Sequence, residues 1–95
     1  MNSLLYPAFH TLDIAEQPMP VVGEGEALMH VSACGICGSE LDAYRHKSPR
    51  RPPPLILGHE FCGELVSVNG AGPFKAGDKV VCNALVACGE CVRCK

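Results

Sequence analysis

Glycine and proline punctuate this chain so often that only short elements fit between them. Ten glycines and eight prolines fall among the 95 residues, and they gather at Pro18–Gly25, Pro49–Pro54 and Asn69–Pro73. Proline removes a backbone donor and glycine tolerates turn geometry, so each cluster favours a turn or an extended loop. The sequence therefore predicts a mostly β chain with one or two short helices and no repeats.

The segments between these turns have strand character. Glu26–Ala33 alternates well enough for a half-buried strand, and Phe61–Val68 is rich in β-branched residues, with Gly63 marking a bulge. Lys75–Asp78 is expected to form a tight turn. The remaining expected elements are strands at Leu4–Phe9, Thr11–Ala15 and Lys79–Asn83, and a short helix at Ser39–Lys47.

Composition describes a single small globular domain. Hydrophobic residues make up 47% and charged residues 19% of the chain, and the formal net charge is −2. The basic stretch Arg45–Arg51 is short and is expected to be a solvated loop, so neither nucleic acid nor an anionic membrane is an expected partner. No apolar run approaches transmembrane length.

Seven cysteines are many for this length, and an odd number cannot all pair. The first residues, Met1–Pro7, contain no basic residue and no long apolar run, so they do not resemble a signal peptide. We therefore expect a cytoplasmic protein whose cysteines stay reduced, and metal binding becomes the better explanation for their number.

Two glycine-flanked segments supply a mixed ligand set. Cys37 offers a thiolate, and His59 and Glu60 offer an imidazole and a carboxylate. This N/S/O set suits a zinc ion with one coordination position left open, as in a catalytic site. Glu60 could be a third ligand, an exchanging ligand, or a partner of the metal or its water.

Each of these residues also has a structural interpretation. Cys37 alone would be a small buried hydrophobe, and His59 alone a hydrogen-bonded structural histidine. Ser39 and Asp42 form an S-x-x-D pattern that predicts a capping box for the short helix. That cap is compatible with a second role, in which the Ser39 hydroxyl relays a proton. The co-occurrence of all these residues favours the catalytic metal.

The Cys34-x-x-Cys37 pair suggests two other sites. A redox dithiol normally starts a helix within a βαβ unit, and no such pattern surrounds this pair. A zinc ribbon with Cys88 and Cys91 would need a much shorter separation than this sequence has. We rank both below the mixed ligand set.

The most specific local motif is Cys88-Gly-Glu-Cys91-Val-Arg-Cys94. Its spacing places three sulfurs around one point, whereas a structural zinc takes four ligands. Cys82 is a possible fourth ligand but shows no knuckle spacing, so Cys62 and Cys82 are predicted to be buried core thiols. The sequence ends at Lys95, where a fourth ligand would be expected to follow, so we expect a truncation within 88–95.

Taken together, these motifs resemble the N-terminal part of the zinc-dependent medium-chain dehydrogenases/reductases, in the sorbitol/threonine/alcohol dehydrogenase-like branch. The resemblance runs in order through Gly25–Glu40, Leu57–Glu60, Lys75–Val80 and the C-terminal cysteines, and covers nearly the whole chain. It implies a GroES-like, partly open β-barrel over residues 1–95, as a fragment of an alcohol dehydrogenase-like protein.

The resemblance also implies roles for the site residues. Cys37 and His59 would bind the catalytic zinc, with Glu60 a ligand or an exchanging one, and Ser39 would relay the substrate proton. Cys88, Cys91 and Cys94 would be the first three ligands of a structural zinc whose fourth ligand is missing. In this family a substrate alkoxide on zinc gives a hydride to NAD or NADP on a separate Rossmann domain.

Two departures from the family pattern stand out. Glu40 occupies the position where the family usually has Asp, and its extra methylene is expected to shift a hydrogen bond that orients a ligand. No G-x-G-x-x-G occurs, so the nicotinamide site lies outside this sequence. We therefore expect the 95 residues alone to be inactive on an alcohol or polyol, and exposed barrel edges to promote self-association. The alternative is a zinc-binding GroES-like module without turnover.

Overall fold

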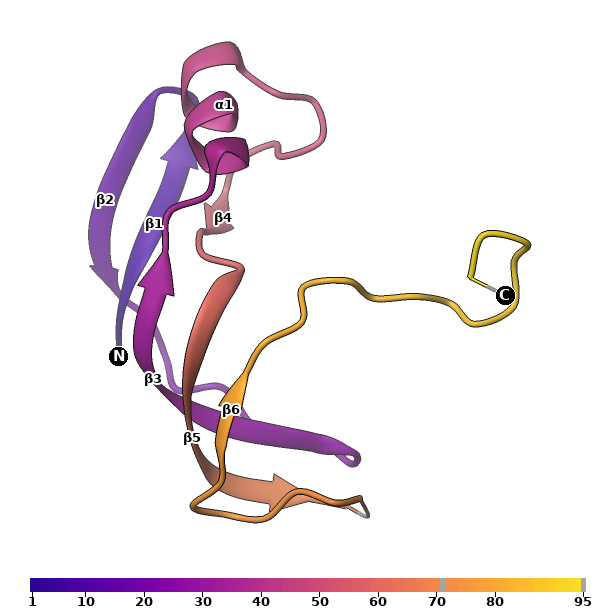
Figure 1. The fold of residues 1–95 in the computed structure, drawn as a ribbon. Coiled ribbons are helices and arrows are strands. Elements are labelled where there is room, and N and C mark those ends of the chain that lie inside the picture. The colour runs from indigo at the N-terminus through magenta and orange to yellow at the C-terminus, as the bar shows by residue number, and fades with distance from the viewer. Residues whose placement is uncertain (71, 95) are drawn as a thin grey trace.

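The computed structural model describes residues 1–70 and 72–94 and contains six strands and one helix in those ranges (Figure 1). The predicted elements are confirmed, with ends that shift by a residue or two. They are β1 (Asn2–Ala8), β2 (Thr11–Glu16), β3 (Glu26–Gly35), α1 (Gly38–His46), β5 (Glu60–Asn69) and β6 (Lys79–Val81). The structure adds one short strand that the sequence does not predict, β4 (Leu55–Ile56).

The strands form two antiparallel three-stranded sheets. One sheet has the order β2-β1-β4 and the other the order β3-β5-β6. The sheets are not joined into a closed barrel in the described residues, which agrees with the expected partly open, mostly β fold. The 49–54 segment forms no helix or strand, as its prolines predict.

Helix α1 packs against the β2-β1-β4 sheet, and residues of both elements form a small buried core. Tyr6 of β1 is completely buried, and its hydroxyl donates a hydrogen bond of 2.9 Å to the Ala43 carbonyl. Ala43 is buried on α1, and Glu40 lies one turn earlier on the same helix face. This contact fixes α1, and with it the segment that precedes the helix.

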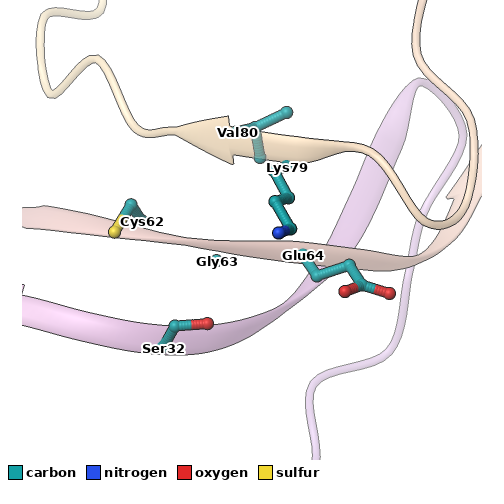
Figure 2. Close-up of a pocket in the computed structure, with 6 residues that line it drawn as sticks. All are labelled: Ser32, Cys62, Gly63, Glu64, Lys79 and Val80. Carbon is teal, nitrogen blue, oxygen red and sulfur yellow. The ribbon is translucent and has the colours of Figure 1, made fainter.

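The second sheet is bent by two register shifts. Val31 pairs with Gly63 and Ala33 with Cys62, which leaves Ser32 as an extra residue on β3. Figure 2 shows Ser32 beside Gly63 in a shallow hollow. A Cβ on Gly63 would collide with the His30 carbonyl, so glycine is required there. The predicted bulge is confirmed, but its extra residue belongs to β3.

Two predictions about burial are wrong. Cys62 is exposed and Cys82 is only half-buried, so neither is a core thiol. On β5 the buried side is formed by Gly63 and Leu65, and Cys62 lies on the opposite, outward side. On β3 only Leu28 and Met29 are half-buried, because the register shift beside Met29 interrupts the alternation. A single sheet without a covering layer buries little on its outer face.

The turn before β6 forms as predicted. The Lys75 backbone N–H donates to Asp78 Oδ2 at 3.0 Å, and Lys75 Nζ lies 3.1 Å from Asp78 Oδ1. These hydrogen bonds from Lys75 lower the pKa of the Asp78 carboxyl. The expected turn at Asn69–Pro73 and the expected 88–95 lobe each include one residue outside the described ranges. Nowhere in those ranges is a helix both long and apolar enough to cross a bilayer.

Candidate metal centres

The structure brings Cys37, His59 and Glu60 together. One ligand atom from each of these side chains lies within 4.8 Å of the other two. The three residues come from two separate segments: Cys37 immediately precedes α1, and Glu60 begins β5 directly after His59. The structure therefore places side by side the three residues that the sequence predicts as ligands of one metal.

Strand register explains why these segments meet. Near the end of β3, Cys34 pairs with Phe61 and Gly35 with Glu60. The chain then leaves β3 and reaches Cys37 two residues later, so Cys37 comes to lie beside the start of β5. The antiparallel pairing of two distant strands thus sets the separation between the thiol and the imidazole.

The backbone conformation of Gly58 determines the direction in which the chain enters His59. Its φ of +112° lies in a region that residues with a side chain rarely adopt. A Cβ at this position would also lie 2.8 Å from Cys34 Sγ. Both the backbone conformation and the packing at Gly58 therefore require glycine.

Glu40 contacts both ligand segments from a buried position. It is only 7% exposed. The Cys37 backbone N–H donates to Glu40 Oε2 at 2.8 Å, and His59 Nδ1 lies 2.9 Å from Glu40 Oε1. The second contact is short but not aligned as a hydrogen bond, and Oε1 has no hydrogen-bond partner in the described residues.

The predicted role of Ser39 as helix cap is wrong. Helix α1 begins at Gly38, its N-cap residue is Cys37, and Glu40 occupies the third helical position. The cap is displaced because the Glu40 side chain reaches back to the Cys37 backbone, as in a capping box. The Ser39 hydroxyl is buried and has no hydrogen-bond partner among the described residues, so it is available for another role.

The donors fit a zinc ion. Sulfur, nitrogen and oxygen donors from Cys37, His59 and Glu60 converge. Zinc binds such a set of three donors and keeps one coordination position open. Nearby in the sequence, the buried Ser39 hydroxyl and the buried Oε1 of Glu40 have no hydrogen-bond partner within residues 1–70 and 72–94. Polar atoms left in this state are costly unless another group completes the site.

A second cluster consists of Cys88, Cys91 and Cys94. Their sulfurs lie within 4.8 Å of one another, and all three residues are exposed. The Sγ atoms of Cys88 and Cys91 lie 3.5 and 3.3 Å from that of Cys94. Figure 1 shows this segment extending away from both sheets. Cys82 is not part of the cluster within the described part of the chain.

Cys88 is the cysteine best prepared to bind a metal. The Cys91 backbone N–H donates to Cys88 Sγ at 3.4 Å. This hydrogen bond, together with those from the Glu90 backbone and the Cys94 and Cys91 thiols, lowers the pKa of Cys88 to about 6. Metal ligation requires the thiolate, so Cys88 is already in the binding form at neutral pH.

The two alternative uses of Cys34 find no support in the geometry. Neither Cys34 nor Cys37 clusters with the C-terminal cysteines in the described residues, so the zinc ribbon is not formed. All strand pairs are antiparallel there, so the βαβ setting of a redox dithiol is also missing. Sequence reasoning missed the double contact of Glu40, although a glutamate three residues after Cys37 is a capping-box signal.

Comparisons with known proteins agree with this geometry. Residues 23–95 match the alcohol dehydrogenase GroES-like domain family. Sorbitol dehydrogenase from Bacillus subtilis is 39% identical over 88 residues, which are 88% of this chain and 25% of that enzyme. L-threonine 3-dehydrogenase from Thermococcus kodakarensis is 37% identical over 87 residues, which cover 87% of this chain and 25% of the relative.

The fold comparison is equally direct. An alcohol dehydrogenase from Thermotoga maritima superimposes with a TM-score of 0.89 at 35% identity, covering 99% of this chain and 28% of that one. The chain thus spans only about a quarter to a third of the length of the proteins it matches. From its ligand clusters, its strand topology and these matches, the chain belongs to the alcohol dehydrogenase GroES-like domain family, as the N-terminal region of a zinc-type medium-chain dehydrogenase/reductase.

Proposed function

We propose that this chain forms the zinc-binding, substrate-side part of a dehydrogenase that oxidises an alcohol or polyol with NAD or NADP. The convergence of Cys37, His59 and Glu60 carries this proposal, because it places thiolate, imidazole and carboxylate donors around one point. The names of the relatives, which include sorbitol and threonine dehydrogenases, support an alcohol-bearing small molecule as substrate. We also propose a cytoplasmic location, on the sequence grounds given above.

The nicotinamide cofactor would lie on a Rossmann domain outside these 95 residues. The described strands pair only antiparallel, whereas a nicotinamide fold needs a parallel sheet. A relative from E. coli, solved with NADH, is nearly four times as long as the stretch that matches, since this chain covers 27% of it. We therefore propose that the 95 residues alone turn over no substrate.

Each side chain of the proposed site has its own role. When bound, zinc supplies positive charge that stabilises negative charge developing on the substrate oxygen. Cys37 and His59 would hold the metal, with Glu60 a third or exchanging ligand. The Ser39 hydroxyl lies two residues from Cys37 in the sequence, is buried and has no hydrogen-bond partner in the part of the chain that the structure describes, so it can accept the substrate proton and pass it on.

The exposed cysteines would form a separate structural site. We propose that Cys88, Cys91 and Cys94 supply three of the four thiolates of a structural zinc. The low pKa of Cys88, about 6, supports metal binding at neutral pH.

The test combines zinc analysis with NAD- and NADP-linked oxidation of a panel of alcohols and polyols. The protein joined to its Rossmann domain should oxidise at least one substrate, and Cys37→Ser should lose one zinc and about 10³-fold or more in rate, because the metal supplies several kcal/mol of charge stabilisation. Cys62→Ser is the matched control, since Cys62 is exposed and belongs to neither cluster. A Cys37→Ser variant with full activity would refute the proposal.

A further inference from the structure

We propose that the basic stretch, residues 45–51, binds the phosphate group of a small molecule. Four of the eight lysines and arginines of the chain fall within these seven residues, namely Arg45, Lys47, Arg50 and Arg51. With four cations and no Asp or Glu, the stretch carries a formal charge of +4. It is separate from both metal centres, and its ligand can be measured without turnover. The inference therefore does not depend on the proposed dehydrogenase activity.

The four cations of the basic stretch have no acidic partner in residues 1–70 and 72–94. The one ion pair within those ranges that involves the stretch joins His46 to Asp42 at 4.0 Å, and no carboxylate oxygen lies within 4 Å of any of the four cations. Positive charges gathered in this way repel one another. A bound anion would offset that repulsion.

The end of α1 accounts for only part of this charge. Arg45 and His46 lie in the last helical turn, where cations interact favourably with the helix dipole. Lys47 ends the helix in the left-handed conformation, with a φ of 48°, and Arg50 and Arg51 follow beyond it. The effect of the dipole falls off within the last turn, so it gives no reason for these two arginines.

A tight turn holds Arg50 and Arg51 in a defined conformation. The Arg50 backbone N–H donates to Ser48 Oγ at 3.3 Å, and the Arg51 backbone N–H donates to the Ser48 carbonyl at 3.2 Å. Prolines at position 49 and at positions 52–54 restrict the backbone on both sides. Guanidinium groups bind phosphate oxygens through paired N–H donors, and a stiff backbone reduces the entropy lost on binding.

The basic stretch is held in a fixed place relative to the Cys37 site. It forms the loop between α1 and β4 (Figure 1), and β4 pairs with β1. On the helix side, His10 Nδ1 lies 2.6 Å from the Tyr44 carbonyl oxygen, which ties the end of α1 to the β1–β2 turn. At the rise of an α-helix, Lys47 lies about 15 Å from Cys37. A phosphate bound here belongs either to an elongated substrate or to a separate small molecule, and both sources offer the same chemistry.

The charge of the rest of the chain limits the size of the ligand. Outside the basic stretch, four lysines and arginines are outnumbered by ten Asp and Glu residues, which gives a net charge of −6. Nucleic acid or an anionic membrane would meet this negative charge as well as the stretch. A compact phosphate group meets only the stretch. The charge pattern therefore favours a small molecule.

The test measures the binding of inorganic phosphate and of sorbitol 6-phosphate by calorimetry. It uses the protein joined to its Rossmann domain and saturated with its nicotinamide cofactor, which fills the phosphate sites of that domain. We expect Arg50→Gln/Arg51→Gln to weaken the binding of both probes about tenfold or more, because charge-assisted hydrogen bonds are lost. Lys79→Gln/Arg93→Gln is the matched control: it removes two exposed positive charges outside the stretch and should bind both probes as the parent does.

Thermal unfolding shows whether the double variant is folded. If it is not, Arg50→Gln alone changes an exposed side chain and should still weaken the binding of both probes at least about threefold. Equal binding by the parent and the folded variant would overturn the inference, because the phosphate would then lie on a zinc ion or elsewhere. A parent that binds duplex DNA but neither probe would overturn it as well.

Cys37→Ser distinguishes the two sources of the phosphate. If the phosphate is part of the substrate, this variant should weaken the binding of sorbitol 6-phosphate but not that of inorganic phosphate, because the polyol also contacts the metal site. If the ligand is a separate phosphate, neither affinity changes. Both results support the inference. Phosphate binding in a protein that oxidises no alcohol would overturn the proposed function alone, so the two failures are distinguishable.

Discussion

The two clusters of metal-ligating residues are built in opposite ways. Cys37, His59 and Glu60 come from segments far apart in the sequence and meet through strand register and a buried carboxylate. Cys88, Cys91 and Cys94 lie within one exposed stretch, and in the described residues the hydrogen bonds of these cysteines stay within it. The first cluster therefore depends on the whole fold, whereas the second depends on its own turn. A change that disturbs the sheets should damage the first and spare the second.

The largest effect is expected from Gly63→Ala. Its Cβ would collide with the His30 carbonyl, a backbone atom that cannot move without opening the β3–β5 pairing. We expect a loss of about 3 kcal/mol in the free energy of unfolding, at the upper end of overpacking costs. Urea denaturation measures this loss. Chelator competition should show weaker zinc binding at the Cys37 site and unchanged zinc binding at the cysteine knuckle, which is the cluster of Cys88, Cys91 and Cys94.

Ser67→Ala is the control for Gly63→Ala, because Ser67 is exposed on the same strand. It should change the stability by less than about 0.5 kcal/mol. Equal loss of zinc from both sites in Gly63→Ala would show that the knuckle also depends on the sheets, and would remove the contrast between the two clusters.

A smaller effect is expected from Gly58→Ala. The new methyl group would lie 2.8 Å from Cys34 Sγ, and alanine at a φ of +112° is strained. The strain should cost roughly 2 kcal/mol, in the range for unfavourable backbone conformations. Thermal unfolding and zinc affinity at Cys37 are the measurements, since His59 directly follows the altered residue.

The double variant Cys34→Ala/Gly58→Ala divides this cost into two parts. Removing the sulfur relieves the collision but leaves the backbone strain, so stability should recover only in part. Gly38→Ala serves as the control, because no atom lies within 4 Å of the added methyl group and no unusual φ is involved. Complete recovery in the double variant would mean that the collision alone sets the requirement for glycine.

Next in size is Tyr6→Phe, which removes the hydroxyl that ties β1 to α1. The lost hydrogen bond to the Ala43 carbonyl is buried, so the variant should lose about 1 kcal/mol. Tyr44→Phe is a matched control, because the Tyr44 hydroxyl makes no hydrogen bond in the described residues and is partly exposed. Equal stability of the two variants would mean that the hydroxyl of Tyr6 does not anchor the helix that begins beside Cys37.

Much of this fold was predictable because its strands end at residues with strong local preferences. Glycine and proline clusters limited the lengths of the elements, and Lys75–Asp78 closes its turn through hydrogen bonds between neighbours. The cysteine spacing in 88–94 likewise describes a local arrangement, and the three sulfurs do converge. Local chemistry of this kind can be read from a single sequence.

The failed predictions, apart from the helix cap, concern contacts between distant segments. The sequence predicts Cys62 as a buried core thiol, but burial depends on which side of β5 another layer covers. The sequence predicts the helix cap at Ser39, whereas the Glu40 side chain reaches back to the Cys37 backbone and moves the cap to Cys37. The bulge near Gly63 was expected, yet the strand that carries the extra residue depends on pairing. Pairing and layering are set by the whole chain.

The smallest change, a shift in pH, tests whether the knuckle is truly local. Hydrogen bonds from the Cys91 backbone and its neighbours lower the pKa of Cys88 to about 6. Cys88 is therefore a thiolate above pH 6, and its reactivity should fall as the pH drops through that value. In the metal-free protein, alkylation of Cys88 by iodoacetamide, located by mass spectrometry, should have its midpoint near pH 6. An ordinary free cysteine would have its midpoint at about 8.5.

A synthetic peptide of residues 86–94 sharpens this test. All the groups that lower the pKa of Cys88 lie within that peptide, so a self-sufficient turn would give the same midpoint as the protein. Cys94→Ala removes one of the contributing hydrogen bonds and should move the midpoint upward in both. If the peptide instead reacts as an ordinary thiol, the turn needs the rest of the chain to form. The second cluster would then depend on the fold as the first one does, and the contrast between them would be one of exposure alone.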